Sequence, residues 1–373
     1  MRNLFLTLTI ISNLVLFSQT TNNEERLWEQ GKLTWDDFNG TPPYANSKNA
    51  SELNYTLSYY NTQKKVANTV FNFFTTKNSM NPDISWVKAS SKSAQLLTYN
   101  QTLFNIIELH RRKLQKELYY VEFPFLAESK LRTSFQSYTY TIKEFQAQTE
   151  MGTNESELTY WNNKINTALQ NTPLPELPEI EDGNWGVGMS IGVGTGIFTN
   201  TISNHFTSTT NLLFGFDIAY KKTILYLNGS LNFNKVKNDY TENGLTWNQG
   251  LKTGVAVIDV SIGQAIIDNN KHKLSPFAGL GVLEFTPRSS KEVYDDYTIV
   301  DYNLMYGINY DFKFRRTINL SILPNSFAAY KDKTEHNIRL RLYATSGSYE
   351  NMKGNSINLA IGYSFFTRKI SVK

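Results

Sequence analysis

Residues 185–197 read WGVGMSIGVGTGI, in which bulky side chains alternate strictly with glycine or serine. Successive side chains of a β-strand point to opposite faces, so the segment predicts a strand with one bulky, mostly apolar face and one face of very small side chains. Such a face suits the crowded interior of a narrow closed barrel. The stretch therefore indicates how the C-terminal half of the chain is built.

The same two-residue period recurs down to the C-terminus. Alternating segments predict four more strands, and three further strands fill the gaps between them. The total of eight is an even number, as in antiparallel barrels that span bacterial outer membranes. The long connection at 314–335 departs from this pattern and leaves room for additional strand. The four alternating segments are 212–220, 302–314, 338–343 and 357–365, and the gaps hold strands at about 223–234, 247–263 and 272–285.

The polarity of the two faces predicts which one meets lipid. A soluble ligand-carrying barrel turns its apolar face inward and covers its outside with lysine and glutamate. Here the polar face is mainly glycine, serine, asparagine and alanine, and the bulky face ends in tyrosine and phenylalanine, as an interfacial aromatic girdle does. We therefore expect an outer-membrane barrel, with a soluble β-sandwich as the alternative. The charges of the polar face have both signs and can pair inside: Asp217, Asp301, Asp311, Lys313, Arg339 and Arg341.

The first residues predict an export signal. Arg2 precedes an apolar stretch from Leu4 to Phe17, which ends in polar residues at 18–20. That order is typical of a cleaved secretory signal peptide, here covering residues 1–19. An N-terminal anchor helix is the alternative, but the run is short and interrupted by polar residues. No later segment holds the roughly 20 apolar residues that a spanning helix needs.

Composition narrows the possible chemistry. The chain of 373 residues has no cysteine, which excludes disulfides, thiolate metal sites and a lipidated N-terminal cysteine. The formal net charge is +4, and the basic residues form no patch interleaved with aromatic residues. Nucleic acid is therefore not an expected partner.

Residues 20–172 follow a different pattern, in which two strands precede three helices. A proline-rich segment, TPLPELPEIEDG at 172–183, then predicts a stiff linker. We place this linker at 173–184 and the barrel at 185–373. The predicted strands cover 53–60 and 66–75, and the helices run from Ser90 or Ser91 to about 119, then over 130–148 and 156–170.

Short motifs between residues 27 and 172 resemble those of a family of secreted zinc peptidases of otherwise unknown function. The segment LTWDDFNGTPP at 33–43 is similar to the W-x-DF-x-G opening of that family, and LLTYNQTLFNIIELHRR at 96–112 is similar to its LL-x-HEQ-x-HFD-x-x-EL-x-x-R helix. TEMG at 149–152 and WNNKI at 161–165 resemble its T-x-HG and W-x-x-x-I patterns. The strand and helix pattern, together with this resemblance, predicts a two-domain fold class, an α+β peptidase-like periplasmic domain followed by an all-β, eight-stranded antiparallel transmembrane barrel.

The resemblance also implies that the catalytic positions are degenerate. Tyr99 stands where the first zinc histidine would be, Asn100 replaces the general-base glutamate, and Leu103 replaces the second histidine. Met151 replaces a downstream histidine that would be a third ligand. Two histidines at i and i+4 share a helix face and hold zinc while the glutamate activates water, and the replacing side chains cannot do this chemistry.

Other residues of this region offer no replacement site. His110 follows Glu108 on the same predicted helix, but residues two apart point to different faces. We expect both residues, together with Arg111, Arg112 and Lys113, to lie on a solvated helix face. The sequence therefore predicts no catalytic residue, no bound metal and no cofactor.

The sequence favours a non-catalytic, peptidase-like segment that a small barrel anchors to the outer membrane of a Gram-negative cell, where it binds or scaffolds in the periplasm. The expected partners are outer-membrane lipid and a periplasmic protein or peptide. Two other classes stay open, an active hydrolase with an unrecognised site and a barrel that acts as a narrow channel or as an adhesin through its outer loops. The interior of an eight-stranded barrel is just wide enough for side chains, which disfavours a general pore.

Overall fold

The computed structural model describes residues 25–43, 49–242, 244–288, 297–321 and 330–373. The expected signal peptide at 1–19 lies outside these residues. The chain divides into two compact units, which are described one at a time. The barrel unit comprises Tyr59–Thr76, Lys113–Thr133 and Leu174–Lys373, and the helical unit comprises the remaining residues up to Pro173.

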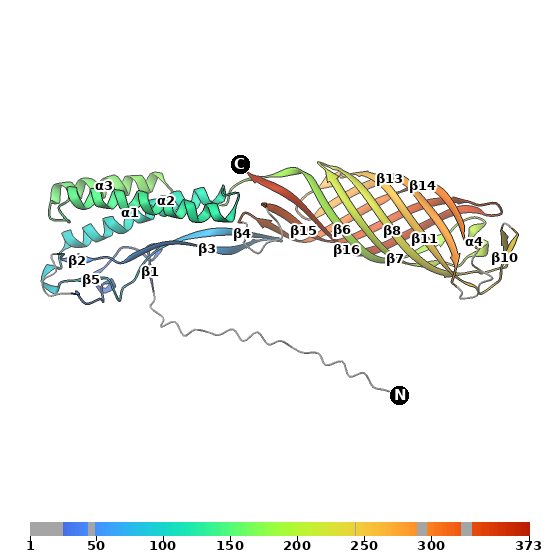
Figure 1. The fold of residues 1–373 in the computed structure, drawn as a ribbon, viewed down its shortest axis with the longest axis horizontal. Coiled ribbons are helices and arrows are strands. Elements are labelled where there is room, and N and C mark those ends of the chain that lie inside the picture. Colours follow the sequence, from blue (N-terminus) through green and yellow to red (C-terminus); the bar gives the residue numbers. More distant parts are fainter. Residues whose placement is uncertain (1–24, 44–48, 243, 289–296, 322–329) are drawn as a thin grey trace, which may run out of the picture. The chain divides into compact units, whose positions relative to one another are not determined.

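Eight long antiparallel strands close into a barrel in the barrel unit (Figure 1). Each long strand pairs with the next one along the chain, and β16 pairs with β6 to close the ring. We call the end that holds the β7–β8 and β11–β13 turns the turn end, and the opposite end the loop end. The strands are β6 (Ile180–Phe198), β7 (Thr209–Tyr220), β8 (Thr223–Lys235), β11 (Lys252–Gln264), β13 (His272–Pro287), β14 (Ile299–Asn319), β15 (Asp332–Ser348) and β16 (Lys353–Val372).

The two faces of the barrel strands are as the sequence predicts. Buried and exposed residues alternate along the whole of β7. The bulky side chains point outward, so that Ile191 is 60% exposed and Leu304 is 67% exposed, whereas the inward-pointing Asp217 and Arg339 are 2% and 5% exposed. The predicted eight-stranded barrel with an apolar outside and a polar inside is confirmed.

Two strands extend further at the turn end than their hydrophobic pattern indicates. The predicted connection at 314–335 contributes its first residues to β14 and its last residues to β15. The two extensions pair with each other, from Arg315 opposite His336 to Asn319 opposite Asp332. They carry mostly polar and charged side chains on both faces, so they lack the alternation that marks the rest of each strand.

The expected two-domain fold class is wrong. Strand β4 (Thr69–Met80) lies in the region assigned to the N-terminal domain, yet it pairs in parallel with β14, from Thr69 opposite Arg316 to Asn72 opposite Asn319. The barrel sheet therefore continues into the N-terminal region as one sheet of twelve strands. The fold is an eight-stranded barrel with four added strands and a few helices, and not a peptidase-like domain followed by a separate barrel. The added strands are β1 (Arg26–Leu27), β3 (Tyr55–Val66), β4 and β12 (Ile267–Asp268).

Side chains reinforce the pairing of β4 with the barrel. Asn68 Nδ2 donates to the carbonyl oxygens of Asn270 and Lys313 at 2.8 and 3.0 Å. Asn72 Nδ2 donates to Oδ1 of Asn319 at 2.6 Å. A small apolar cluster completes the contact, so this end of β4 is held by hydrogen bonds and by packing. The cluster contains Phe71 and Phe73 of β4 with Ile318, Leu320, Ile370, Leu177, Ile180 and Val372.

The last turns of helix α1 (Ala94–Tyr119) also belong to the barrel unit. Gln115 donates Nε2 to the carbonyl oxygen of Phe74 at 2.8 Å, and its Oε1 accepts the backbone N–H of Thr76 at 2.8 Å. The Lys331 ammonium donates to the carbonyl oxygen of Tyr119. A cation is favoured there because the last carbonyls of a helix lack partners and carry the negative end of its dipole. Burial lowers the pKa of Lys331 to about 8.

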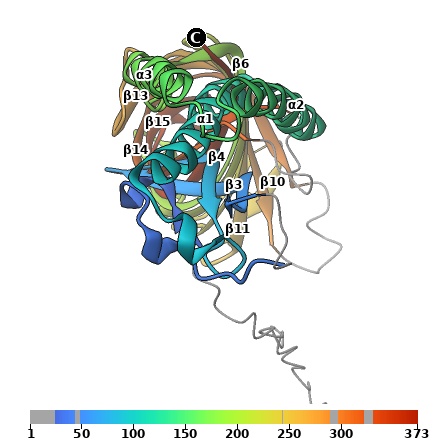
Figure 2. The ribbon, with the colours of Figure 1, turned by 90° about the vertical axis from the view of Figure 1, so that its left-hand side faces the viewer.

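Parts of the three long helices lie side by side in the helical unit (Figure 2). Tyr99 of α1 stacks on Phe145 of α2 (Pro124–Gln148) with ring centroids 5.2 Å apart, and Phe145 meets Trp161 of α3 (Glu155–Asn171) edge-on at 5.6 Å. Among the described residues, no helix is both long and apolar enough to cross a bilayer. The remaining short elements are the 3₁₀ turns Trp28–Gln30, Trp35–Asp37 and Ala89–Ser91, helix α4 (Ile202–His205), and strands β2 (Ser51–Glu52), β5 (Trp86–Val87), β9 (Tyr240–Glu242) and β10 (Leu245–Trp247).

Replacing Phe71 by alanine should loosen β4 from the barrel. The change removes apolar contacts with Ile318 and Leu320, and truncating a partly buried phenylalanine costs about 1–3 kcal/mol, below the range for a full core site. Hydrogen exchange of residues 69–76 in detergent should speed up, while exchange in β7 stays the same. Phe125→Ala, at a phenylalanine that is 68% exposed, is the matched control. Unchanged exchange at 69–76 in the Phe71 variant would contradict the assigned packing.

Candidate functional site

One arginine connects two carboxylates across the barrel lumen. The Arg339 guanidinium on β15 contacts Asp311 on β14 (Nε–Oδ1 2.7 Å, Nη2–Oδ2 3.0 Å) and Asp217 on β7 (Nη2–Oδ2 2.6 Å, Nη1–Oδ1 3.1 Å). Pairs of this bidentate form are among the strongest charge-assisted hydrogen bonds in proteins. Because β7 lies three strands from β15 around the ring, Arg339 braces the wall across the interior.

A second arginine on the same strand braces the barrel in the other direction. Arg341 donates Nη2 to both carboxylate oxygens of Asp259 on β11, at 3.1 and 3.3 Å. Asn228 and Ser261 donate to the same carboxylate at 3.0 and 2.8 Å. The Arg341 guanidinium lies 4.3 Å from the ring centroid of Phe277. The Arg341 guanidinium thus has an opposite charge and an aromatic ring beside it, although its Nε and Nη1 have no hydrogen-bond partner among the described residues.

The glycines of the opening sequence stretch leave room for these arginines. Gly192 of β6 and Gly362 of β16 are directly paired, and both border a small space that Arg339 and Arg341 also line. A Cβ atom on Gly192 would lie 2.8 Å from the carbonyl oxygen of Ile361. The space that remains measures about 30 Å³, which is room for one or two water molecules. Arg339, Arg341 and the carboxylates that they bind occupy the lumen at this level.

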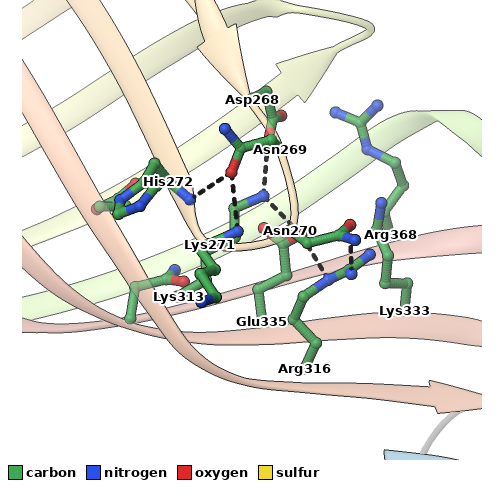
Figure 3. Close-up of polar contacts among 12 residues, drawn as sticks. Asp268, Asn269, Asn270, Lys271, His272, Lys313, Arg316, Lys333, Glu335 and Arg368 are labelled. Atoms are coloured by element: carbon green, nitrogen blue, oxygen red, sulfur yellow. Dashed lines mark hydrogen bonds and ion pairs between the residues drawn. The ribbon is translucent and has the colours of Figure 1, made fainter. Parts of the chain in front are cut away.

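Charged and amide side chains also close the turn end of the barrel (Figure 3). Lys313 Nζ contacts Glu335 at 2.9 Å and also contacts Asp268, which lies in the turn between β11 and β13. Arg316 Nη1 donates to Oδ1 of Asn270 at 2.7 Å. These contacts tie the turn to the extensions of β14 and β15.

Aromatic side chains fill the loop end. The Phe206 ring lies 4.5 Å from Phe285 and 6.0 Å from Trp247, measured between centroids, and all three rings are at most 2% exposed. The buried Glu242 carboxylate accepts the hydroxyl of Tyr240 and two backbone N–H groups of the β15–β16 loop, at 2.7 and 3.1 Å. The described parts of these loops therefore form a packed cap.

Rings gather on the outer face near the turn end. His272 Nδ1 lies 2.8 Å from the hydroxyl of Tyr310, and His336 Nδ1 lies 2.6 Å from the hydroxyl of Tyr363. Amphipathic rings at one height are typical of a boundary between lipid and water. Toward the loop end the outer face is mainly apolar, with exposed side chains that include Met189, Ile191, Val193, Phe214, Ile258, Val260, Leu280, Leu304, Leu340 and Leu359.

In the helical unit, two of the positions that the resemblance made candidates for a zinc site come together. The Tyr99 hydroxyl donates to Sδ of Met151 at 3.5 Å, and burial raises the pKa of the Tyr99 phenol. Gly152 has a φ of +90°, and a Cβ atom there would lie 2.8 Å from Cγ of Tyr99. The turn after α2 is thereby pressed against the ring, and Tyr99 stays a protonated packing residue.

The other two zinc-site candidates, Asn100 and Leu103, also have structural roles. Asn100 is 1% exposed, and its Nδ2 donates to Oγ of Ser51 and to the carbonyl oxygen of Leu96, both at 2.9 Å. Leu103 is buried. Within the described ranges, no three histidine, aspartate or glutamate side chains are placed to hold a metal ion. His110 is buried and does not lie on a solvated face as predicted.

Of the charged residues on this part of α1, Glu108 and Arg111 are buried and Arg112 is half-buried, against the prediction of a solvated face, whereas Lys113 is exposed as predicted. Glu108 is fully buried and accepts hydrogen bonds from Arg111 at 2.7 and 2.8 Å and from Arg112 at 2.7 Å. Arg112 Nη1 also donates to the carbonyl oxygens of Leu169 and Thr172, at 2.9 and 2.8 Å. The charge pattern of α1 alone could not predict this result, because Arg112 is held by carbonyl oxygens at the end of α3.

A cleft of about 860 Å³, lined by both polar and apolar side chains, lies between α1, α3 and the segment around Trp28. A chain of amides forms its wall: Gln101 donates to Asn105 at 2.8 Å, Asn105 to Asn166 at 3.1 Å, and Asn166 to Asn162 at 3.0 Å. Sequence reasoning missed this cleft because asparagine and glutamine carry no recognisable motif. The available signal was their spacing of four residues on each helix, which places each pair on one face.

Comparison with solved structures gives outer-membrane proteins that cover about half of this chain. No protein-family model and no curated protein matches the chain, so the resemblance to zinc peptidases gains no support. The similar solved structures include Ail, the attachment invasion locus protein of Yersinia pestis, in complex with sucrose octasulfate, with 13% identity over 49% of this chain and 99% of that chain (TM-score 0.27). Neisserial surface protein A has 7% identity over 50% and 97% (TM-score 0.31), and the N-terminal barrel of Pseudomonas aeruginosa OprF has 10% over 49% and 99% (TM-score 0.24).

Removing Arg339 should destabilise the barrel strongly. Arg339→Ala leaves Asp217 and Asp311 buried without their cation, and breaking a buried ion pair in this way costs about 3–5 kcal/mol. Urea unfolding of detergent-folded protein, followed by tryptophan fluorescence, measures the loss. Arg315→Ala, at an exposed arginine on β14, should change the unfolding free energy little. Adding Asp217→Asn and Asp311→Asn to Arg339→Ala should recover part of the loss. Equal effects of the two single arginine variants would refute the bracing role.

We expect the purified protein to hold no stoichiometric zinc. The Tyr99 phenol is protonated and bonded to Met151, and the Asn100 amide is bonded to Ser51, so neither offers the ligands of a zinc site. Metal analysis by mass spectrometry should find less than one zinc per chain, and a chelator should leave the melting temperature unchanged. Stoichiometric zinc together with chelator-sensitive cleavage of casein would overturn this expectation.

Proposed function

We propose that the chain is an outer-membrane protein in which a closed barrel serves as the anchor and the N-terminal region serves as the binding part in the periplasm. In this proposal residues 1–19 are removed on export, residues 20–172 lie on the periplasmic side, and 173–184 lead into the membrane-embedded segment 185–373. Outer-membrane lipid is one partner, and the binding part takes a second.

The single observation that carries the membrane assignment is the exposed apolar face of the barrel. Side chains such as Ile191, Ile258 and Leu304 are about 60–67% exposed, on strands whose inward residues are small, polar or charged. Soluble proteins rarely expose contiguous apolar patches larger than a few hundred Å². A bilayer covers such a belt, and the ring of tyrosine, phenylalanine and histidine at the turn end matches the height of its interface.

The packed lumen supports an anchor in preference to a channel. Arg339 and Arg341 cross it in opposite directions, and the space left between them and the glycines is about 30 Å³. Aromatic rings such as Trp247 and Phe285 fill the loop end. An ion would have to displace these side chains to pass.

A second role, adhesion through the loops, is favoured by the order of the loop end. The buried Glu242 binds backbone N–H groups of a neighbouring loop, and Trp247 is fully buried in the cap. Loops fixed in this way present a constant surface to the outside. We rank this role second because the described loop residues offer no specific ligand chemistry.

Placing an arginine on the exposed apolar face of the barrel tests whether that face contacts lipid or water. Leu304→Arg should cost about 2–4 kcal/mol in lipid bilayers, because a charged side chain on the lipid face near mid-bilayer is poorly solvated. Leu174→Arg, at a leucine that is 48% exposed outside the barrel, should cost little. Urea titration of protein folded into liposomes, read by heat-modifiable migration, measures both. If Leu304→Arg is as harmless as Leu174→Arg, the belt does not face lipid.

A further inference from the structure

We propose that the amide-lined cleft between α1 and α3 binds a neutral sugar chain. This inference deepens the proposed function, because it names the ligand class of the binding part. The cleft does not include Tyr99, Asn100 or Leu103, so it is a different surface from the positions that the peptidase resemblance singled out.

The cleft has the size of a ligand site. Its volume of about 860 Å³ lies within the range of roughly 300–1,000 Å³ that is usual for small-molecule pockets. It is lined by the inner faces of two helices, and helices position side chains more precisely than loops do. A ligand of two or three sugar rings fits this space.

Its wall is a preorganised row of amides. Asn105 lies at the centre, where its Oδ1 accepts from Trp28 Nε1 and from Gln101 Nε2, both at 2.8 Å. Its Nδ2 donates to Oδ1 of Asn166, and Asn166 Nδ2 donates in turn to Oδ1 of Asn162. These bonds fix which end of each amide is oxygen and which is nitrogen. In the part of the chain that the structure describes, Asn162 Nδ2 donates to no protein group, so it remains for a ligand.

Two of the three charged side chains that line the cleft are paired inside the protein, which favours a ligand without strong charge. Arg112 lines the cleft, but its guanidinium is bound to Glu108 and to the carbonyl oxygens of Leu169 and Thr172. Glu29 at the edge is paired with Arg111 at 3.0 Å. Lys32 also lines the cleft and is exposed, and the other polar side chains of the lining are amides and the hydroxyl of Thr98. Each amide both donates and accepts hydrogen bonds, as do the hydroxyl and acetamido groups of sugars.

Apolar groups in the cleft match the other half of a sugar's surface. Trp28, Leu97 and Leu169 line it alongside the amides, and the Trp28 ring is held by its Nε1 bond to Asn105. Sugar rings have C–H faces that pack against such groups. A peptide would instead call for a sheet edge or for separate pockets that take alternate side chains. A continuous amide row is less suited to that purpose.

The test titrates the full-length protein in detergent with defined oligosaccharides. Chitotetraose and maltotetraose are both neutral and rich in hydroxyl groups, but only chitotetraose carries acetamido groups. Comparing their affinities therefore shows which of the two kinds of sugar chain the cleft binds. Tetra-alanine and heparin fragments stand for peptides and anionic chains. Calorimetry or ligand-observed NMR measures affinity, and heat-modifiable migration of the same sample reports separately whether the barrel is folded.

The matched variants lie on one helix. Asn162→Ala combined with Asn166→Ala removes the end of the amide row, and Asn163→Ala changes the exposed neighbour that does not line the cleft. Loss of two hydrogen bonds of ordinary strength should weaken sugar binding by roughly tenfold or more. Asn163→Ala should bind like the unchanged protein, and all variants should keep the same melting temperature within a few degrees.

Binding of either neutral tetrasaccharide, weakened by the Asn162/Asn166 double change and unaffected by Asn163→Ala, would support the proposal. Three results would overturn it: no binding of either sugar to folded protein, sugar binding that the double variant retains, or binding of tetra-alanine or heparin at this cleft instead. A double variant that unfolds is replaced by Gln101→Glu, which puts a negative charge in the row and should also abolish neutral sugar binding. Failure of barrel folding affects heat-modifiable migration alone and so is distinguishable from failure of the cleft.

Discussion

The contact of Arg339 with Asp217 and Asp311 is the constraint on which the barrel depends. A buried guanidinium is tolerated when carboxylates and hydrogen bonds replace its water, and here two carboxylates from strands on different sides of the ring do so. A shift of β15 by one residue would turn Arg339 toward the apolar outside, so the pair selects one register. The glycines of β6 and β16 follow from the same requirement, since the guanidinium needs the volume that they leave empty.

The barrel could be predicted because its information is local. From Trp185 onward, each strand has one apolar and one polar face in its own sequence. In the structure the apolar faces form the outside of the barrel and the polar faces line the lumen. The strand ends beyond Arg315 could not be predicted, because polar residues on both faces leave no alternation. The pairing of Thr69 with Arg316 could not be predicted either, since backbone hydrogen bonds between strand edges do not depend on side-chain type. The proline-rich segment at 173–184 therefore looked like a boundary between independent domains.

The candidate sites divide in the same way. Tyr99 and Met151 were named from the sequence and lie together, and their lack of zinc chemistry stays a prediction. Glu108 is paired with Arg111 and Arg112 of its own helix, and Arg112 also binds a carbonyl oxygen at the end of α3, a contact that the sequence of α1 does not show. The amide row was missed because its two halves, on α1 and α3, are ordinary residues until the helices bring them together. The roles of these polar groups depend on contacts between segments that are distant in the sequence, so they could not be predicted from either segment alone.

The pairing of β4 with β14 also sets an order in time. Thr69 is synthesised long before its partner Arg316, which lies 247 residues further along the chain. Until β14 exists, the N–H and C=O groups on that edge of β4 have no strand to bind, and an unpaired edge is where chains join each other by mistake. Contacts between such distant segments form late. The edge of β4 must therefore stay unpaired, and shielded from other copies of the chain, until β14 has been synthesised.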